Sequence, residues 1–293
     1  MIKISNLTKI FKGNIVAVNN LSIEIGSGVY GLVGENGAGK STLLRCIADV
    51  YEKTSGEILI DGLDSSTAEG RKKIFFLSDN PFCNKNDNAF ETMRFYESLF
   101  DLDVEIFKCL INKLSLPLNR KVSTYSKGMK RQLFLCIALS IKAQYILLDE
   151  AFDGLDPIVQ TVVKEEICES SKDKTYIISS HNIPSLEKLC DNFILLSKGT
   201  LTKTGSPQDI GKNYCKFQVF FKESVTKEQI DELGINVVHY SKSGSITHLI
   251  LEDENLIEVI KKSFETILCE KVAITNDEII KLELLLKNKG GNK

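Results

Sequence analysis

Residues 1–30 alternate between polar and apolar positions in short runs, and glycine and asparagine interrupt these runs. Alternation with a period of two is typical of β-strands that bury one face. The apolar residues Gly31–Val33 then pass into a glycine-rich loop and the helical segment STLLRCIADV. The pattern therefore predicts strands and turns over residues 1–30, followed by a strand–loop–helix unit.

The middle of the chain combines helical periodicity with continuous apolar runs. Leucine and phenylalanine recur at three- and four-residue spacing over residues 88–145, which predicts helices. Near-continuous apolar strands that alternate with helices are typical of an α/β fold, in which helices cover both faces of a parallel sheet. The strands predicted here span residues 56–62, 73–77, 145–149, 176–179 and 192–196.

The pattern changes after the segment GSPQDIGKN at residues 205–213, where Gly, Ser and Pro gather. The order that follows, βαββαβ and then a last helix, predicts a small α+β, ferredoxin-like sandwich. We therefore expect two domains, residues 1–212 and an accessory C-terminal domain of residues 213–293. The predicted C-terminal elements are strands at 216–221, 235–240, 246–251 and 271–274, and helices at 227–233, 256–267 and 277–286.

The composition of the chain argues against several classes of function. The 37 basic and 39 acidic residues leave a net charge of −2, which argues against a dedicated nucleic-acid-binding protein. No apolar run approaches the ~20 residues that cross a bilayer, and the N-terminus lacks the apolar segment of a signal peptide, so we expect a cytoplasmic location. The eight cysteines show no C-x-x-C pair, which favours reduced thiols over a disulfide framework or a metal site.

The glycine-rich loop carries the clearest motif. Residues 34–41, GENGAGKS, fit G-x-x-x-x-G-K-[ST] at every fixed position. Glycines allow successive backbone N–H groups to converge on phosphate oxygens, and the helix that follows directs its positive end at the anion. Lys40 would reach the β- and γ-phosphates, and the Ser41 hydroxyl suits Mg²⁺. The loop predicts a nucleoside triphosphate site.

A pair of acids supplies the second half of such a site. The apolar run YILLD ends in Asp149, and Glu150 follows it. Ligands of α/β proteins bind at the carboxyl ends of the strands, so Asp149 is expected to reach the metal. Glu150 points elsewhere and is placed to polarise a water for attack on the γ-phosphorus.

A third segment, YSKGM at residues 125–129, opens a helix shortly before the two acids. Ser126 alone would be an ordinary helix N-cap. Together with the loop and the acids, however, the segment resembles the LSGGQ signature of ATP-binding cassette (ABC) nucleotide-binding domains. Ser126 and Gly128 match that signature, whereas Lys127 and Met129 depart from it. The resemblance covers about the first 210 residues.

The resemblance implies roles for further residues. Residues 153–156, DGLD, look like the D-loop, and His181 resembles the switch histidine that contacts the γ-phosphate. Phe11 matches the aromatic residue that stacks on adenine. Glu150 and His181 are thus the expected catalytic residues, and Asp156 the expected D-loop residue. The expected nucleotide-binding residues are Phe11, Gly34, Glu35, Asn36, Gly37, Ala38, Gly39, Lys40, Ser41 and Thr42.

One position departs from the family pattern. The family usually has a glutamine after the strand that aligns with IFFLS, where it contacts Mg²⁺ and senses the membrane partner. Asp79 occupies this position. A carboxylate is a good Mg²⁺ ligand, so Asp79 joins Ser41 and Asp149 as an expected metal ligand. A one-residue slip would give the position to Asn80 instead.

In the family, two cassettes meet head to tail, and the signature of one caps the ATP of the other. The resemblance thus implies a homodimer, or a heterodimer with a similar cassette, in which Ser126, Gly128 and Met129 act in trans. It also implies that ATP and Mg²⁺ are the cofactors. With no membrane segment in the sequence, a separate permease is expected to dock on the helical region 81–145 and hold the subunit at the membrane.

The expected function is therefore that of an ATP-hydrolysing subunit of a transporter. The C-terminal part resembles the tail of cassettes paired with ABC-2 type exporters, which favours export. Its role stays open between dimer support or regulation and a passive appendage. The main alternative is a soluble ABC ATPase that acts on ribosomes or DNA, although only one cassette and no sustained heptads are found. A nucleotide sensor without hydrolysis and a P-loop kinase fit the motifs less well.

Overall fold

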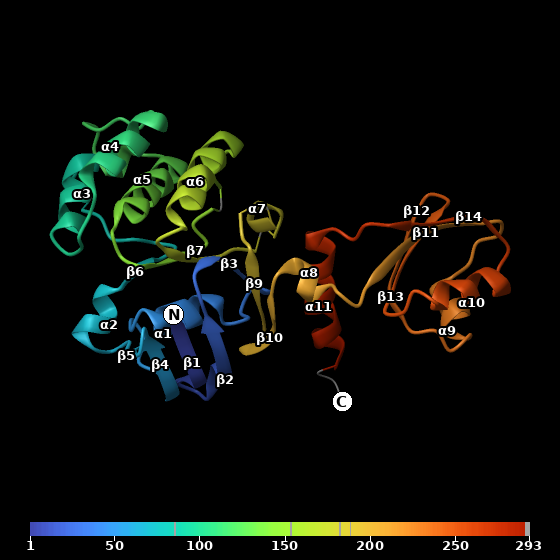
Figure 1. Cartoon of the computed structure of the whole chain (residues 1–293). Helices are drawn as coiled ribbons and strands as arrows, with labels where there is room; N and C mark the ends of the chain where they lie inside the picture. The colour runs from blue at the N-terminus through green and yellow to red at the C-terminus, as the bar shows by residue number, and fades with distance from the viewer. Residues whose placement is uncertain (85, 153, 182, 188, 291–293) are drawn as a thin grey trace. The chain divides into compact units, whose positions relative to one another are not determined.

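The computed structural model describes residues 1–84, 86–152, 154–181, 183–187 and 189–290, with the side chains of 287–290 left out. The chain divides into two compact units, Met1–Thr204 and Gly205–Lys293 (Figure 1). The division falls slightly before the sequence-based boundary after residue 212, because helix α8 (Pro207–Ile210) packs against the C-terminal helix α11 (Asn276–Gly290).

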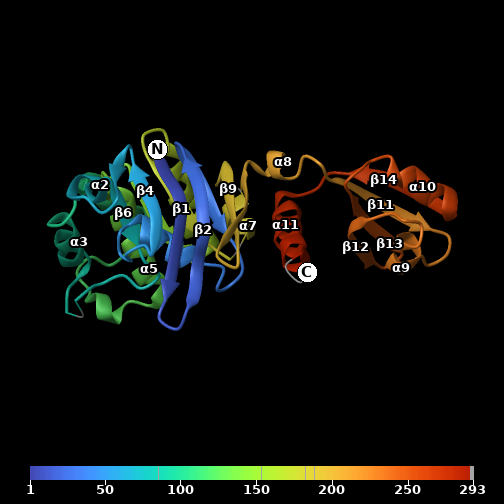
Figure 2. The same cartoon turned by 90° about the horizontal axis from the view of Figure 1, so that it is seen from below.

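An antiparallel sheet opens the first unit. Its strands have the order β2–β1–β4–β5, and Figure 2 shows β2, β1 and β4 side by side. Alternate side chains of β1 and β2, such as Ile2, Ile4 and Ile23, are buried, as the period-two pattern predicts. The bounds are β1 (Ile2–Phe11), β2 (Ile15–Ile25), β4 (Ser55–Ile60) and β5 (Leu63–Asp64).

A six-stranded sheet of order β10–β9–β3–β8–β7–β6 forms the centre of the unit, and its strands from β9 to β6 run parallel. Strands β7 and β8 are buried at every position, as expected for a sheet covered on both faces. The bounds are β3 (Gly28–Val33), β6 (Ile74–Leu77), β7 (Tyr145–Asp149), β8 (Thr175–Ser179), β9 (Asn192–Ser197) and β10 (Thr200–Gly205).

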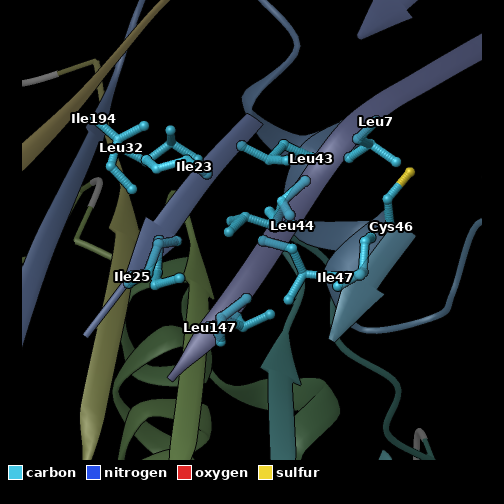
Figure 3. Close-up of a cluster of buried hydrophobic side chains, with 14 of the residues drawn as sticks. Leu7, Ile23, Ile25, Leu32, Leu43, Leu44, Cys46, Ile47, Leu147 and Ile194 are labelled. Atoms are coloured by element: carbon cyan, nitrogen blue, oxygen red, sulfur yellow. The ribbon is translucent and has the colours of Figure 1, made fainter. Parts of the chain in front are cut away.

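Helix α1 (Lys40–Ile47) packs between the two sheets. Its residues Leu43, Leu44 and Ile47 gather with Ile25 of β2 and Leu147 of β7 in one buried cluster (Figure 3). Cys46 belongs to the same cluster, and burial raises the pKa of its thiol to about 11. This packing fixes the position and direction of the helix start, where the glycine-rich loop ends.

The helical region predicted over 81–145 contains α3 (Ala89–Glu97), α4 (Val104–Lys113), the 3₁₀ turn Val122–Thr124 and α5 (Lys127–Ser140). Figure 1 shows these helices together, away from β1, β2 and β4. Side chains cap their starts: Asn88 forms a capping box with Glu91, and Asp103 and Ser126 accept backbone N–H groups. The remaining helices of the unit are α2 (Ala68–Lys72), α6 (Pro157–Ser170) and α7 (Ile183–Glu187).

The second unit has the predicted βαββαβ order, and its antiparallel sheet has the strand order β12–β13–β11–β14. Helices α9 and α10 cover one face of it through Ile230, Ile257 and Ile260. Its further description as a ferredoxin-like sandwich stays a prediction. The bounds are β11 (Cys215–Phe221), α9 (Lys227–Asp231), β12 (Val237–Ser243), β13 (Ile246–Leu251), α10 (Leu256–Ser263) and β14 (Thr266–Val272).

Two sequence-based boundaries in this unit are wrong. The helix predicted to reach residue 267 ends at Ser263, and the strand predicted at 271–274 spans Thr266–Val272. Strand β14 pairs with β11 over this stretch but buries none of its side chains fully, so its apolar signal is weak. Within the described residues, the structure contains no helix that is both long enough and apolar enough to cross a membrane.

Candidate functional site

At two positions, Gly34 and Gly39, the loop between β3 and α1 passes too close to neighbouring backbone for a side chain. Gly39 has φ 101° and precedes the first residue of α1, and a Cβ there would lie 2.4 Å from the Ala17 carbonyl oxygen. A Cβ at Gly34 would lie 2.4 Å from the Leu196 carbonyl oxygen. Both contacts are shorter than real Cβ atoms show, so the glycines of the motif hold the loop against β2 and β9.

The start of α1 is open to an anion. The structure describes every residue of this helix start. Gly39 provides no side-chain cap there, and the first turn of α1 carries no acid. Free N–H groups and the helix dipole favour a negative charge at such an end. Lys40 is buried, and its Nζ donates to the carbonyl oxygens of Gly34 at 2.7 Å and Glu35 at 3.2 Å. The ammonium group thus lies inside the loop.

The other predicted loop residues divide between the surface and the core. Glu35, Asn36 and Gly37 are exposed at the tip of the loop, whereas Ala38 is buried in the core cluster around α1. Thr42, in the first turn of α1, is half-buried.

Asp149 lies at the carboxyl end of β7 and is fully buried. Its Oδ1 accepts hydrogen bonds from Ser41 Oγ at 2.9 Å and Ser179 Oγ at 2.7 Å. Its Oδ2 makes no hydrogen bond among the described atoms, although it is buried. Such an atom calls for a partner, and a hard cation fits a carboxylate beside a serine hydroxyl. The residues present therefore fit Mg²⁺, and the assignment of Asp149 and Ser41 as its ligands stays a prediction.

Glu150 has a left-handed backbone with φ 51°, which is uncommon outside glycine. Its N–H donates to Ser179 Oγ at 2.9 Å and to the Ser179 carbonyl oxygen at 3.2 Å, and these two bonds hold the turn. Its carboxylate lies between two cations or potential cations: Oε1 is 3.8 Å from Lys40 Nζ, and Oε2 is 3.1 Å from His181 Nδ1. The structure thus brings both predicted catalytic residues together beside the loop lysine.

Sequence reasoning missed Ser179. Ser179 is the register partner of Asp149 on the neighbouring strand. Its hydroxyl donates to Asp149 Oδ1 and accepts the backbone N–H of Glu150. The sequence predicts a strand that ends at Ser179, but it does not say that this strand lies beside the acid-bearing strand.

The predicted adenine contact lies on the hairpin of β1 and β2. Phe11 is half-buried and meets Tyr51 edge to face at 5.5 Å, with Lys9 Nζ 5.1 Å from its ring centre. Its register partner Ile15 is 63% exposed, and Val16 is 47% exposed. An exposed apolar strip of this kind suits the face of a base, and sequence reasoning missed Ile15 and Val16.

The predicted signature and D-loop residues make local contacts. Ser126 accepts the Met129 N–H at 3.1 Å as the N-cap of α5, and Asp156 accepts the N–H groups of Ile158 and Val159 as the N-cap of α6. No contact described in the structure joins Ser126 or Asp156 to Lys40 or Asp149. Asp153 lies outside the described residues.

Asp79 follows β6 at the same sheet edge as the other acids. Its Oδ1 is 3.1 Å from Arg45 Nη2, so this carboxylate has a cationic partner in the structure. Its assignment as a metal ligand stays a prediction, as does the alternative of Asn80.

Comparison with known proteins agrees with this geometry. Residues 18–153 match the family described as "ABC transporter". The chain is 30% identical over 257 residues to the ABC transporter ATP-binding protein YtrB of Bacillus subtilis, covering 80% of this chain and 84% of that protein. It is 35% identical over 207 residues to the lantibiotic transport ATP-binding protein SrtF of Streptococcus pyogenes, covering 69% and 89%.

A solved structure gives the same fold. The dimeric post-hydrolysis ATP-binding cassette MJ0796, bound to ADP and Pi, matches with a TM-score of 0.61 and 22% identity, over 70% of this chain and 98% of that one. The α/β cassette fold expected from the sequence is thereby confirmed. The chain belongs to the family of ABC transporter ATP-binding proteins, ATPases that bind ATP with Mg²⁺, pair as dimers and act with membrane permease subunits.

Proposed function

We propose that the chain is the ATP-hydrolysing subunit of an exporter and drives a separate membrane permease. The observation that carries this proposal is the meeting of Lys40, Asp149 and Glu150 at the carboxyl edge of one parallel sheet. Such an edge, with an uncapped helix start beside it, binds and cleaves a phosphate chain in this fold class.

Each residue has a defined task in this proposal. The loop amides and Lys40 bind the β- and γ-phosphates, and Phe11 stacks on the adenine. Mg²⁺, held by Ser41 and Asp149, supplies charge neutralisation of the phosphate oxygens when it is bound. Glu150 orients and polarises the attacking water, and Ser179 holds its backbone.

His181 acts on the same water and γ-phosphate from the other side of Glu150. Its side chain is 60% exposed while its Nδ1 contacts Oε2 of Glu150 at 3.1 Å. In this proposal the exposed imidazole turns toward the phosphate and orients the carboxylate once ATP fills the site.

A second copy of the chain, or a similar cassette, completes the site. Ser126 with the start of α5 provides donors of the right kind for an anion. Gly128 supports this role, because a Cβ there would meet no atom closer than 3.8 Å. The fold itself therefore does not require glycine at this position, whereas close approach of a nucleotide would.

We place the permease contact on the helical region. Phe82, Phe95 and Leu99 are large apolar residues with exposures of 59%, 36% and 61%, and the Phe82 and Phe95 rings are 5.4 Å apart. Leu99 lines a cavity of about 670 Å³, and a second cavity of about 190 Å³ is lined by the chain neighbours of Phe82, Pro81 and Cys83, and by the first turns of α5. Exposed apolar patches beside a hollow mark docking surfaces.

Export is the direction we favour. The C-terminal unit resembles the tail of cassettes paired with ABC-2 type exporters, and SrtF is named for lantibiotic transport. In this proposal the permease holds the subunit at the inner face of the membrane.

The variant Glu150→Gln tests the hydrolytic part. It removes the base but keeps the binding residues, so it should bind ATP, lose turnover and accumulate as a dimer. Gel filtration with light scattering in ATP and Mg²⁺ measures this, with Lys40→Ala as the matched control that stays monomeric. A Glu150→Gln protein that remains monomeric at saturating ATP would contradict the proposal.

Co-purification tests the transport part. Pull-down from the native membrane, followed by reconstitution of the recovered complex in vesicles, should give an integral membrane partner and ATP-dependent substrate movement away from the side that holds the subunit. Recovery of ribosomes or DNA in place of a membrane protein would favour the soluble ABC ATPase instead.

A further inference from the structure

Arg45, in the last turn of α1, lies between two carboxylates. Its Nη2 is 3.1 Å from Asp79 Oδ1 and 3.9 Å from Asp149 Oδ2. The two acids differ in environment, since the side chain of Asp79 is 54% exposed and that of Asp149 is fully buried. One guanidinium nitrogen therefore faces both the predicted metal ligand and the residue at the family's glutamine position.

The hydrogen bonds of Asp149 explain why Arg45 matters. Ser41 and Ser179 both bond Oδ1, and Oδ2 has no hydrogen bond among the described atoms. A buried carboxylate oxygen needs a compensating charge. At 3.9 Å, Arg45 supplies that charge through space and not as a hydrogen bond, whereas its contact with Asp79 is short enough to be one.

A third contact limits where the guanidinium group can go. Its central carbon lies 5.6 Å from the ring centre of Tyr51, which in turn packs against Phe11. A guanidinium group stacks favourably on such a ring. Because the Tyr51 ring lies on one side of the guanidinium group, we expect the group to move only a short distance, between Asp79 and Asp149.

We propose that Arg45 is a movable counter-ion of the metal site and that Asp79 controls it. Without nucleotide, Arg45 neutralises Asp149. When Asp149 turns to a metal ion, Arg45 must withdraw, and Asp79 holds it in the withdrawn position. Asp79 is thus a positioning residue that acts through Arg45. This inference rests on the proposed function and differs from direct coordination of Mg²⁺ by Asp79.

The position of Asp79 also links the Arg45 counter-ion to the proposed permease contact. Asp79 lines the 190 Å³ cavity together with Lys127, Lys130 and Arg131 of α5. An occupant that draws Asp79 toward the cavity would return Arg45 to Asp149 and weaken metal binding. Permease contact and metal affinity would then be linked through one ion pair.

Equilibrium binding separates the two roles of Asp79. The full-length chain is titrated with Mg²⁺ in the presence of a fluorescent, non-hydrolysable ATP analogue, and the Mg²⁺ concentration for half-maximal binding is measured. Asp79→Asn should raise it by about tenfold, within the range for residues that support metal ligands. Arg45→Gln should lower it several-fold, because the competing cation is gone.

The double variant decides the matter. With Arg45 removed, Asp79→Asn should have no further effect, so the double variant should match Arg45→Gln. A tenfold increase from Asp79→Asn in the Arg45→Gln background would overturn the inference and favour direct coordination. A higher Mg²⁺ requirement in Arg45→Gln alone would overturn it as well.

Two controls keep the test interpretable. Circular dichroism and thermal unfolding in EDTA show that each variant is folded, and Arg45→Met, with a similar side-chain volume against Tyr51, replaces Arg45→Gln if that variant does not fold. Failure of the wild-type chain to bind the analogue at any Mg²⁺ concentration would overturn the proposed function itself. Normal wild-type binding with additive variant effects would overturn this inference alone.

Discussion

Ser179 and Asp149 are register partners on the parallel strands β8 and β7, and Ser179 Oγ donates a 2.7 Å hydrogen bond to Asp149 Oδ1. The same Oγ accepts the N–H of Glu150 at 2.9 Å. One buried hydroxyl therefore orients the predicted metal ligand and fixes the backbone of the predicted general base. Strand pairing, and not the motif alone, sets the geometry of the site.

Ser179→Ala should lower turnover and raise the Mg²⁺ requirement, each by about tenfold or more, because residues that orient metal ligands have effects of this size. Losing the shared hydroxyl should also cost about 1–3 kcal/mol of stability. ATPase rates across a Mg²⁺ series and thermal unfolding measure the two effects. Ser140→Ala is the matched control, since Ser140 is equally buried and donates only to Cys136 in α5. An unchanged Mg²⁺ requirement would contradict the role given to Ser179.

Gly128→Ala and Gly34→Ala should fail in opposite ways. Gly128 lies in the first turn of α5 with room for a Cβ, so alanine there should keep or slightly raise the melting temperature while ATP-dependent dimerisation weakens. Alanine at Gly34 would place its Cβ 2.4 Å from the Leu196 carbonyl oxygen, so it should destabilise the fold. Thermal unfolding and light scattering with ATP measure both. A fully dimerising Gly128→Ala protein would remove the signature role.

Phe11→Ala should weaken ATP binding by about tenfold, since stacking of a base on an aromatic side chain contributes about 1–3 kcal/mol. Phe11→Trp should keep the affinity because it keeps an aromatic face. Inorganic tripolyphosphate, which has no base, should bind wild type and Phe11→Ala equally. Fluorescence titration and competition by tripolyphosphate give these affinities. A parallel loss of tripolyphosphate affinity would show that the change disturbs the loop and that Phe11 does not read the base.

Much of the fold was predictable because its signals are local. The apolar run Tyr145–Asp149 was predicted at its observed bounds, and the motif at 34–41 was placed between a strand and a helix, as found. Helix α6 was not predicted by position, although Asp156 followed by Pro157 is a strong start signal. Helical periodicity over 88–145 overran the end of α5, because Ile141 leaves the helix to bridge Leu102.

The site was predictable only where a motif carries it. Lys40, Ser41, Asp149 and Glu150 have fixed spacing within motifs, and the structure brings them together. Ser179 and Arg45 have no such signal, because their roles depend on which strands are neighbours and on which side of α1 faces β6 and β7. Neighbourhood in a sheet is a tertiary property that hydrophobic pattern alone does not encode.

The last helix begins with a charged contact that gives a pH-dependent prediction. Glu278 Oε1 is 2.6 Å from Lys216 Nζ, and Glu278 and Thr275 exchange backbone and side-chain hydrogen bonds of 3.0 and 3.2 Å at the start of α11. Burial opposes the charged carboxyl, but the bonds from Lys216 and Thr275 outweigh it and lower the pKa of Glu278. A lowered pKa means that the stabilisation is present above the ordinary carboxyl range and is lost as the pH falls through the lowered value.

The stabilisation of α11 by Glu278 can be measured by hydrogen exchange of the α11 amides. The variants are compared with one another at the same pH. At pH 7, Glu278→Ala should reduce protection about fivefold, the equivalent of a lost cap worth about 1 kcal/mol, because it removes both the cap and the ion pair. Glu278→Gln should reduce it less, since glutamine still caps the helix and loses only the partly exposed ion pair. The gap between wild type and Glu278→Gln should close in acid, where both side chains are neutral. A gap that persists or widens below the lowered pKa would show that charge on Glu278 does not stabilise the helix.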